Sequence, residues 1–118
     1  MIVTLTPNPS IDRTVTTTRL AVGEVNRASS VRVDPGGKGV NVSRALHLNG
    51  HDTLAVLPLG GPNGQSHRRF LDEAAVPHIA VPCGGDTRTN ITVVDADGTT
   101  TKINEPGPPL SGDVLDAL

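Results

Sequence analysis

The hydrophobic and polar positions of this sequence divide it into short strands and amphipathic helices. Short apolar runs that predict buried strands occupy residues 2–5, 52–57 and 78–81. Apolar residues at helical spacing occupy residues 40–48 and 65–75. Strands that alternate with helices in this way predict a parallel sheet with right-handed crossovers.

The two helical segments predict specific buried faces and ends. The residues expected to face inward are Val42, Ala45 and Leu46 in the first helix and Phe70, Leu71 and Ala74 in the second. Gly50 lies where the first helix should end, because glycine readily adopts the left-handed conformation of a C-terminal cap. Residues 60–64 (GGPNG) predict a loop before the second helix, and Ser111 is a candidate N-cap for a third.

Segments rich in threonine and valine predict a second, smaller sheet at one edge of the first. They are residues 14–20 and 25–33, with Gly23 in the turn between them, and residues 89–94 and 99–103, around a hairpin turn at 95–98. The alternation at 31–33 predicts one covered and one wet face. Because the sequence ends just after its last helix begins, we expect the domain to be truncated.

Composition narrows the class of protein. The 118 residues suffice for one domain, and the net charge of −2 provides no electrostatic footprint for nucleic acid. No apolar run approaches a membrane span and the start lacks the basic residues of a signal peptide, so we expect a cytoplasmic protein with no membrane partner. Cys83 is the single cysteine, so no disulfide and no metal site are expected, and the four histidines (His47, His51, His67 and His78) are expected on the surface.

Residues 36–42 (GGKGVNV) carry the clearest candidate chemistry. Glycines let a ligand approach the backbone, and the helix that follows offers free N–H groups and a positive dipole end. Lys38 adds an ammonium group, and Asn41 projects from the same side of the first turn, which favours a polar, anionic small molecule. The run matches neither a Walker phosphate loop nor the dinucleotide fingerprint. A purely structural turn between strand and helix is the alternative.

Three further positions are candidates with simpler alternatives. Asp12 follows a rigid TPNP segment after the first strand and could accept hydrogen bonds from sugar hydroxyls, or be a solvated aspartate in a turn. Arg88 could hold a phosphate with its planar fork, or be an exposed strand arginine; Arg27 is a similar, weaker candidate. The segment 102–108 could orient polar groups through its asparagine and glutamate, or form a turn.

Taken together, these motifs resemble the amino-terminal part of the ribokinase-like (phosphofructokinase B) family of carbohydrate kinases. The motifs that carry the resemblance are TPNP at 6–9, Asp12, GGKGVNV at 36–42, TRTN at 87–90 and TKINEPGP at 101–108, and they cover essentially the whole chain. The resemblance implies an α/β fold, a ribokinase-like doubly wound sheet with a small β-sheet lid, here truncated. Residues 1–118 would be the amino-terminal part of the kinase domain, with lid ribbons at about 13–33 and 88–104 and the nucleotide-binding carboxyl-terminal half absent.

The resemblance also implies roles for individual residues. The substrate-binding residues would be Asp12, Gly37, Lys38, Asn41, Arg88 and Asn90, with Asn8, Arg27, Asn104 and Glu105 as weaker candidates. Asp12 would bind sugar hydroxyls and Arg88 would lie near the substrate phosphate. No catalytic residue is expected in this chain, because the family's base lies in the missing half, together with the site for ATP and Mg²⁺. Lids of this family often pair, which implies a homodimer.

The implied reaction is ATP-dependent phosphorylation of a phosphosugar, fructose 1-phosphate to fructose 1,6-bisphosphate. The TPNP and NEPGP segments point to the phosphosugar branch of the family. Tagatose-6-phosphate kinase is an alternative within that branch, and a non-catalytic sugar-phosphate-binding or dimerisation fragment is an alternative outside it. We expect residues 1–118 alone to be inactive, because in-line transfer also needs a base and bound nucleotide.

Overall fold

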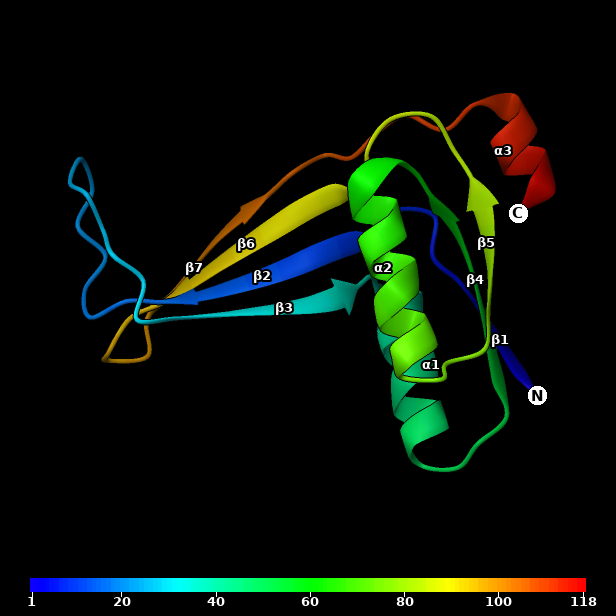
Figure 1. Cartoon of the computed structure of the whole chain (residues 1–118), viewed down its shortest axis with the longest axis horizontal. Helices are drawn as coiled ribbons and strands as arrows, with labels where there is room; N and C mark the ends of the chain where they lie inside the picture. The colour runs from blue at the N-terminus through cyan, green and yellow to red at the C-terminus, as the bar shows by residue number, and fades with distance from the viewer.

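The computed structural model describes all 118 residues as two β-sheets and three helices (Figure 1). The first sheet is parallel and has the order β1-β4-β5. Its strands are β1 (Ile2–Leu5), β4 (Thr53–Leu59) and β5 (His78–Pro82), and the helices are α1 (Lys38–Leu48), α2 (Gly61–Glu73) and α3 (Gly112–Ala117). The predicted alternation of strands and helices around a parallel sheet is therefore confirmed.

The second sheet is four-stranded and extends away from the helices, with its loops at the far end (Figure 1). Its strands are β2 (Ser10–Thr16), β3 (Ser30–Gly36), β6 (Arg88–Val94) and β7 (Thr100–Asn104), in the order β3-β2-β6-β7. Two antiparallel hairpins, β2–β3 and β6–β7, are joined through a parallel pairing of β2 with β6. The predicted separate sheet of ribbons is confirmed, including the hairpin turn at 95–98.

The hydrophobic core lies between the parallel sheet and two helices. Alternate residues of β4 point toward α1 and α2, since side chains of a strand alternate between its faces. The core cluster comprises Val40, Ala55, Leu57, Leu59, Leu71 and Val76. The opposite face of the same sheet is open: Val3, Leu5 and Ile79 are each more than half exposed. These residues therefore leave an aliphatic sheet face without a covering layer.

Helix α1 ends as predicted but buries a different face. The Gly50 N–H donates to the His47 carbonyl and the His51 N–H to the Leu46 carbonyl, a Schellman ending with Gly50 at φ 78°. The predicted stripe is wrong, because Val42 is half exposed and Ala45 is exposed. The buried residues are Val40 and Ser43. Ser43 faces the sheet because its hydroxyl forms hydrogen bonds with the hydroxyls of Thr4 and Thr53.

Helix α2 starts earlier than the sequence indicated. The expected loop at 60–64 is instead the first turn of the helix, since Pro62 lacks an N–H that would need a partner there. The Asn63 N–H is satisfied from outside by the Asp86 carboxylate at 2.9 Å. Of the predicted inward residues, Leu71 is buried and Phe70 half-buried, but Ala74 is exposed because the helix ends at Glu73.

The first two strands of the second sheet, β2 and β3, are shifted relative to the sequence prediction, whereas β6 and β7 lie within one residue of it. Strand β2 begins at Ser10, so Asp12 lies inside a strand rather than in a turn after β1. Strand β3 runs to Gly36, immediately before α1. Val31 is 46% exposed, so the predicted covered face of this segment is open in this chain.

The remaining helix, α3, is capped as predicted. The Ser111 hydroxyl accepts a hydrogen bond from the Val114 N–H at 3.3 Å. None of the three helices combines the length and the apolar character that a membrane crossing requires.

Candidate functional site

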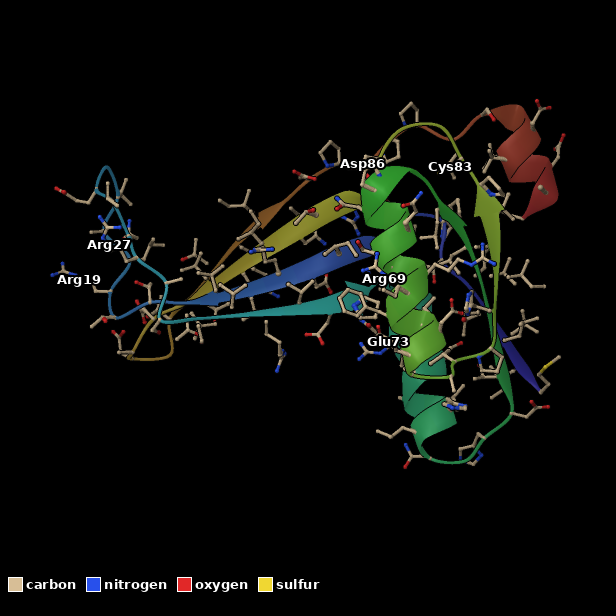
Figure 2. All side chains as sticks on the ribbon, viewed as in Figure 1. Arg19, Arg27, Arg69, Glu73, Cys83 and Asp86 are labelled. Atoms are coloured by element: carbon tan, nitrogen blue, oxygen red, sulfur yellow. The ribbon has the colours of Figure 1, made fainter.

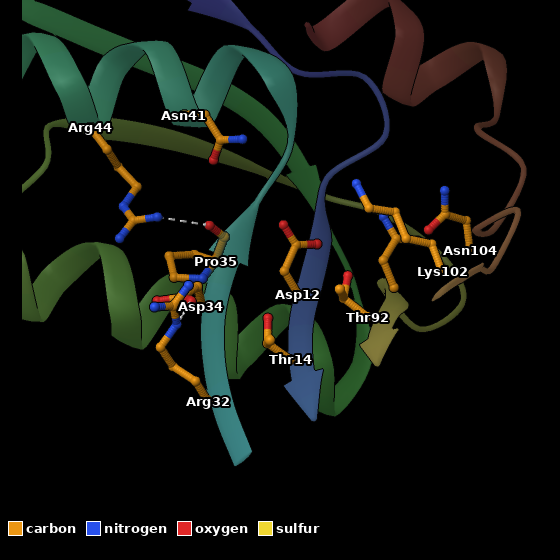
Figure 3. A pocket seen from close by; sticks show the side chains of 11 residues that line it. Asp12, Thr14, Arg32, Asp34, Pro35, Asn41, Arg44, Thr92, Lys102 and Asn104 are labelled. Atoms are coloured by element: carbon orange, nitrogen blue, oxygen red, sulfur yellow. Dashed lines mark hydrogen bonds and ion pairs between the residues drawn. The ribbon is translucent and has the colours of Figure 1, made fainter. Parts of the chain in front are cut away.

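A polar cavity of about 540 Å³ lies between the four-stranded sheet and helix α1 (Figure 3). It is lined by Asp12, Thr14, Arg32, Asp34, Pro35, Asn41, Arg44, Asn90, Thr92, Lys102 and Asn104. Apart from Pro35, all of these residues carry polar or charged side chains. We call this space the polar cavity, and its lining suits a ligand that hydrogen-bonds on all sides.

The strand register explains why so many polar side chains meet in the polar cavity. Partnered residues of adjacent strands share a face, and residues two apart on one strand do so too. The first row across the sheet is Asp34, Asp12, Asn90 and Asn104, and the second is Arg32, Thr14, Thr92 and Lys102. Helix α1 adds Asn41 and Arg44, three residues apart and therefore on one helical face.

Most charges in the polar cavity are already engaged, and two are not. The Arg32 Nε donates to Asp34 Oδ2 at 2.9 Å, and Arg44 donates to the Pro35 carbonyl at 3.2 Å (Figure 3). Asp12 accepts one hydrogen bond, from the Ser10 hydroxyl to its Oδ1 at 2.6 Å. Lys102 makes no hydrogen bond or ion pair within the chain. The Asp12 carboxylate, which has no cationic partner, and the Lys102 ammonium group, which has no partner at all, are thus available to a ligand.

The glycine turn before α1 lies directly against Asp12. A Cβ atom on Gly36 would overlap the Asp12 carboxylate, so any other residue there would displace that carboxylate. Gly37 has φ 124°, a left-handed value that disfavours other residues, and its carbonyl accepts the Asn41 N–H at 2.9 Å. No side chain caps the N-terminus of α1. Its first N–H groups therefore remain available, with the positive end of the helix dipole behind them.

A second, smaller cavity of about 250 Å³ opens at this N-terminus, and we call it the Lys38 cavity. Its lining residues are Leu5, Thr6, Pro7, Asn8, Lys38, Gly39 and Arg88. Lys38 makes no hydrogen bond or ion pair within the chain, and the buried Thr6 hydroxyl has no partner. A cation, a helix N-terminus and an unpaired hydroxyl together suit an anion.

Arg88 connects three segments at the edge of the Lys38 cavity. Its Nη2 donates to the Asn8 carbonyl at 3.1 Å, and its Nη1 donates to the Glu105 carbonyl at 3.3 Å and to Asn90 Oδ1 at 3.4 Å. Its Nε is buried without a partner. Arg88 therefore contacts a lining residue of each cavity, Asn8 and Asn90, and two of its five N–H groups, one on Nε and one on Nη2, remain uncommitted.

The structure gathers most of the residues predicted for the site and leaves two outside. Asp12, Asn41, Asn90 and Asn104 line the polar cavity, and Asn8, Lys38 and Arg88 line the Lys38 cavity. Gly37 forms the turn at the start of α1. Glu105 instead accepts the Thr89 N–H at 2.7 Å. Arg27 lies at the far tip of the four-stranded sheet, near Arg19 and remote from both cavities (Figure 2).

Sequence reasoning missed several lining residues and one buried histidine. The missed cavity residues are Thr14, Arg32, Asp34, Arg44, Thr92 and Lys102. The signal for most of them was polar alternation within single strands, as in Asp12 with Thr14. The expectation that His67 lies on the surface is wrong: it is fully buried, and its Nε2 is 3.0 Å from the Gly36 carbonyl.

The residues described here do not form a metal site. No group of three or more histidine, cysteine, aspartate or glutamate side chains is gathered closely enough to hold an ion. What the two cavities offer is hydrogen bonding and positive charge. The polar cavity fits a polyhydroxylated molecule, and the Lys38 cavity next to it fits an anionic group on the same molecule.

Comparison with known proteins places this chain among carbohydrate kinases. The family model described as pfkB family carbohydrate kinase matches residues 5–112. A 1-phosphofructokinase of Xanthomonas campestris pv. campestris is 42% identical over 106 residues, which are 89% of this chain and 33% of that protein. Phosphofructokinase-2 of Escherichia coli in complex with fructose-6-phosphate superposes with a TM-score of 0.93 at 32% identity, over 98% of this chain and 39% of that one.

The same Escherichia coli enzyme is similar in its tetrameric inhibited form. There the TM-score is 0.90 at 32% identity, over 98% of this chain and 38% of that one. The chain thus spans between a third and two fifths of the length of the relatives it matches.

Proposed function

Since this chain belongs to the pfkB family of carbohydrate kinases, we propose that it is the sugar-binding part of an enzyme that phosphorylates fructose 1-phosphate to fructose 1,6-bisphosphate. The fold is ribokinase-like, with a small sheet beside the main one that would act as a lid over the substrate. The observation that carries the proposal is the pair of cavities, one lined almost entirely by polar side chains and one lined by Lys38 and Arg88.

The polar cavity would hold the sugar hydroxyls. Hydroxyl groups both donate and accept, so they are best matched by a carboxylate together with amides. Asp12 would accept from two hydroxyls through its less engaged oxygen, while Asn41 and Asn90 would donate and accept around them. Lys102 would donate from the opposite side of the cavity.

The Lys38 cavity would hold the phosphate that the sugar already carries. Arg88 lines this cavity and donates to Asn90 of the polar cavity at 3.4 Å, which supports the proposal that one phosphosugar contacts both cavities. Lys38, the uncapped start of α1 and the free Nε of Arg88 supply donors for its oxygens. The fructose-6-phosphate complex of the similar Escherichia coli enzyme supports a fructose phosphate as the ligand class.

ATP and Mg²⁺ are the proposed cosubstrate and metal of the reaction. The residues present do not fit Mg²⁺, since they form no cluster of metal ligands. What residues 1–118 would do is bind the phosphosugar, orient its free hydroxyl and exclude water around it. The cytoplasm, where ATP is available, is the proposed compartment.

Turnover by the whole polypeptide encoded by this reading frame tests the proposal. ATP consumption would be compared for fructose 1-phosphate, tagatose 6-phosphate and fructose 6-phosphate, each against unphosphorylated fructose. We expect fructose 1-phosphate to have the highest kcat/KM. A preference for tagatose 6-phosphate would move the assignment to that kinase, and binding without any turnover would leave a sugar-phosphate-binding module.

Arg88→Ala tests the phosphate subsite. Loss of the guanidinium leaves a partly desolvated phosphate without a partner, a cost of about 2–5 kcal/mol by analogy with truncated buried charge pairs. The KM for phosphosugar should therefore rise at least about tenfold while that for ATP changes little. Arg88→Lys should rescue part of the loss, because lysine keeps the charge and lacks the fork.

The control for this variant is Arg69→Ala, which removes an exposed arginine of α2 that makes no hydrogen bond in the chain (Figure 2). Arg69→Ala should leave both Michaelis constants unchanged. If Arg88→Ala weakens ATP most, or affects fructose and fructose 1-phosphate equally, Arg88 serves the nucleotide or the structure instead.

A homodimer through the lid is the proposed assembly. The face of the four-stranded sheet away from the polar cavity carries aliphatic side chains at alternate positions: Ile11, Val15, Val31, Val33, Ile91, Val93 and Ile103. Val31 and Ile103 are 46% and 60% exposed. A second copy of the same sheet would cover this face with complementary aliphatic surface.

A further inference from the structure

We propose that His67 is a positioning residue for the sugar site, since its imidazole donates a hydrogen bond to the Gly36 carbonyl and so fixes the glycine turn against Asp12. The expected effect on sugar binding rests on the proposed function, whereas the His67–Gly36 hydrogen bond rests on the geometry alone. His67 belongs to α2, far along the chain from the glycine turn, and no side chain of the sequence motifs that suggested a sugar site reaches this carbonyl.

The hydrogen bond determines the tautomer of His67. A carbonyl oxygen only accepts, so the nitrogen 3.0 Å from the Gly36 carbonyl, Nε2, carries the proton. The other ring nitrogen, Nδ1, is buried and has no hydrogen-bond partner. A proton there would be a buried charge with an unsatisfied N–H. The ring is therefore neutral and can only serve as a donor from Nε2.

The surroundings favour the same neutral state. Burial is the largest influence and lowers the pKa of His67 below 6.5, and the ring of His78 on β5 lowers it further. The Gly36 carbonyl, the backbone of His67 itself and the Asp12 carboxylate on β2 act in the opposite direction without overcoming burial. His78 is in turn 3.5 Å from the Asp72 carboxylate of α2.

The hydrogen bond to Gly36 can affect the sugar site because Gly36 packs against the Asp12 carboxylate. Gly36 packs so closely on the Asp12 carboxylate that no Cβ could fit between them, and the Ser10 hydroxyl holds Oδ1 of the same carboxylate. The carboxylate is therefore confined by Gly36 and by Ser10. His67 fixes Gly36 from α2, so a change at His67 would reach the sugar site through a backbone segment, without contact between His67 and the sugar.

Two substitutions separate the donor from the volume of the side chain. His67→Leu fills the buried position with an apolar side chain and removes the N–H donor, which leaves the Gly36 carbonyl without its side-chain partner. His67→Gln keeps an N–H donor four bonds from Cα, the same number as Nε2 of histidine. In the whole encoded polypeptide, we expect His67→Leu to weaken fructose 1-phosphate binding in calorimetry at least tenfold, and His67→Gln to restore it to within about threefold of the original protein.

Leu71→Val is the matched control. It removes one methylene from a fully buried residue of the same helix that belongs to the core and not to the glycine turn. It should lower the melting temperature and leave phosphosugar affinity unchanged. Unchanged affinity in His67→Leu, or an equal loss in His67→Leu and His67→Gln, would overturn the positioning role.

A measurement that needs no sugar keeps the inference separate from the proposed function. In ¹⁵N NMR spectra of the ring nitrogens, His67 should show a protonated Nε2 and an unprotonated Nδ1 at neutral pH, and Nδ1 should take up a proton only below the ordinary histidine pKa of about 6.5. A protonated Nδ1 at neutral pH would overturn the assigned hydrogen bond. The expected spectrum together with no phosphosugar binding would instead contradict the proposed function alone.

Discussion

Asp12 has the surroundings of a carboxylate that is held in place for an external ligand. One of its oxygens accepts the Ser10 hydroxyl at 2.6 Å, and Gly36 confines the side chain on another side. Its neighbour Asp34 is already engaged with Arg32 at 2.9 Å. Of the two carboxylates in the polar cavity, Asp12 is therefore the one without a cationic partner.

Asp12→Asn should mainly weaken phosphosugar binding. An amide keeps the shape but replaces one acceptor oxygen by a donor and removes the charge, and hydrogen bonds to charged groups contribute about 1.5–3 kcal/mol. The dissociation constant for fructose 1-phosphate should rise roughly 10- to 150-fold in calorimetry. Asp52→Asn, at an exposed position between α1 and β4, is the control. Equal affinities for the two variants would remove Asp12 from the site.

Stability should fall on acidification through His67. Its pKa is lower in the fold than in the unfolded chain, where it is about 6.5, so the unfolded state binds more protons below that pH. The contribution of neutral His67 to the free energy of unfolding is fully present above about pH 6.5 and decreases as the pH falls toward the lowered pKa. Urea unfolding at several pH values should show the original protein losing more stability than His67→Gln. Parallel pH curves for the two proteins would contradict this.

The candidate site could be predicted from sequence to the extent that its residues sit in recognisable motifs. The glycine turn, Asp12 and Asn41 are of that kind. Lys102 and Arg44 were missed because their neighbours in space are distant in sequence, and only the register of β7 and the rotation of α1 bring them to the cavity. His67 was missed because a lone histidine on a helix carries no sign of burial.

Helix α1 is attached to the parallel sheet by a directed chain of hydroxyl groups. Thr53 donates to the Ile2 carbonyl at 3.0 Å, so its oxygen accepts from Ser43 at 2.8 Å. Ser43 has then used its proton and accepts from Thr4 at 2.6 Å. All three side chains are buried. The chain fixes the rotation of α1 and hence the direction in which Asn41 points.

Ser43→Ala should destabilise the fold by about 1–3 kcal/mol, because it leaves the buried Thr4 hydroxyl without an acceptor. The urea midpoint should fall with little change in the m-value. Ser66→Ala is the matched control, since Ser66 lies in α2 and makes no hydrogen bond through its hydroxyl; it should stay within about 0.5 kcal/mol. A loss of similar size in both variants would mean that the hydroxyl chain contributes nothing specific.

At the level of elements, the sequence indicated the order of strands and helices and failed at boundaries and buried faces. The start of α2 was missed because glycine and proline punctuate loops, whereas here Pro62 fits the first helical turn and Asp86 satisfies the Asn63 N–H. The buried face of α1 was missed because Ser43 is polar. Both failures arise from contacts between segments that no local pattern contains.

The whole molecule presents two open aliphatic faces, one on each sheet. The face of the parallel sheet exposes Val3, Leu5 and Ile79, and the outer face of the four-stranded sheet exposes Val31 and Ile103. Exposed apolar surface of this kind marks contact with further protein. The open face of the parallel sheet predicts a further layer of the same kinase fold that packs on it. The open face of the four-stranded sheet predicts a contact with a second copy of the protein.

Ile103→Glu should dissociate the proposed dimer. An interface that buries Ile103 against a second copy would have to bury an unpaired carboxylate instead, so the dimer dissociation constant should rise at least about tenfold. Sedimentation equilibrium of the whole encoded polypeptide measures it. Leu48→Glu places the same charge on an exposed apolar residue of α1, outside the sheet face, and should have no effect. A monomeric original protein would refute the assembly.

The parallel pairing of β2 with β6 also sets an order of events on the ribosome. Asn8 and Arg88, which meet at the start of these two strands, are 80 residues apart along the chain. Strand β6 ends 58 residues after β3 does, at Val94 against Gly36, so at synthesis rates of about 5–20 residues per second the β2–β3 hairpin is finished roughly 3–12 s before the whole of β6 is available to pair with it. Throughout that interval the edge of β2 is an unpaired template for other chains. The newly made hairpin is thus a segment at which this protein can pair with other chains before its own β6 has been synthesised.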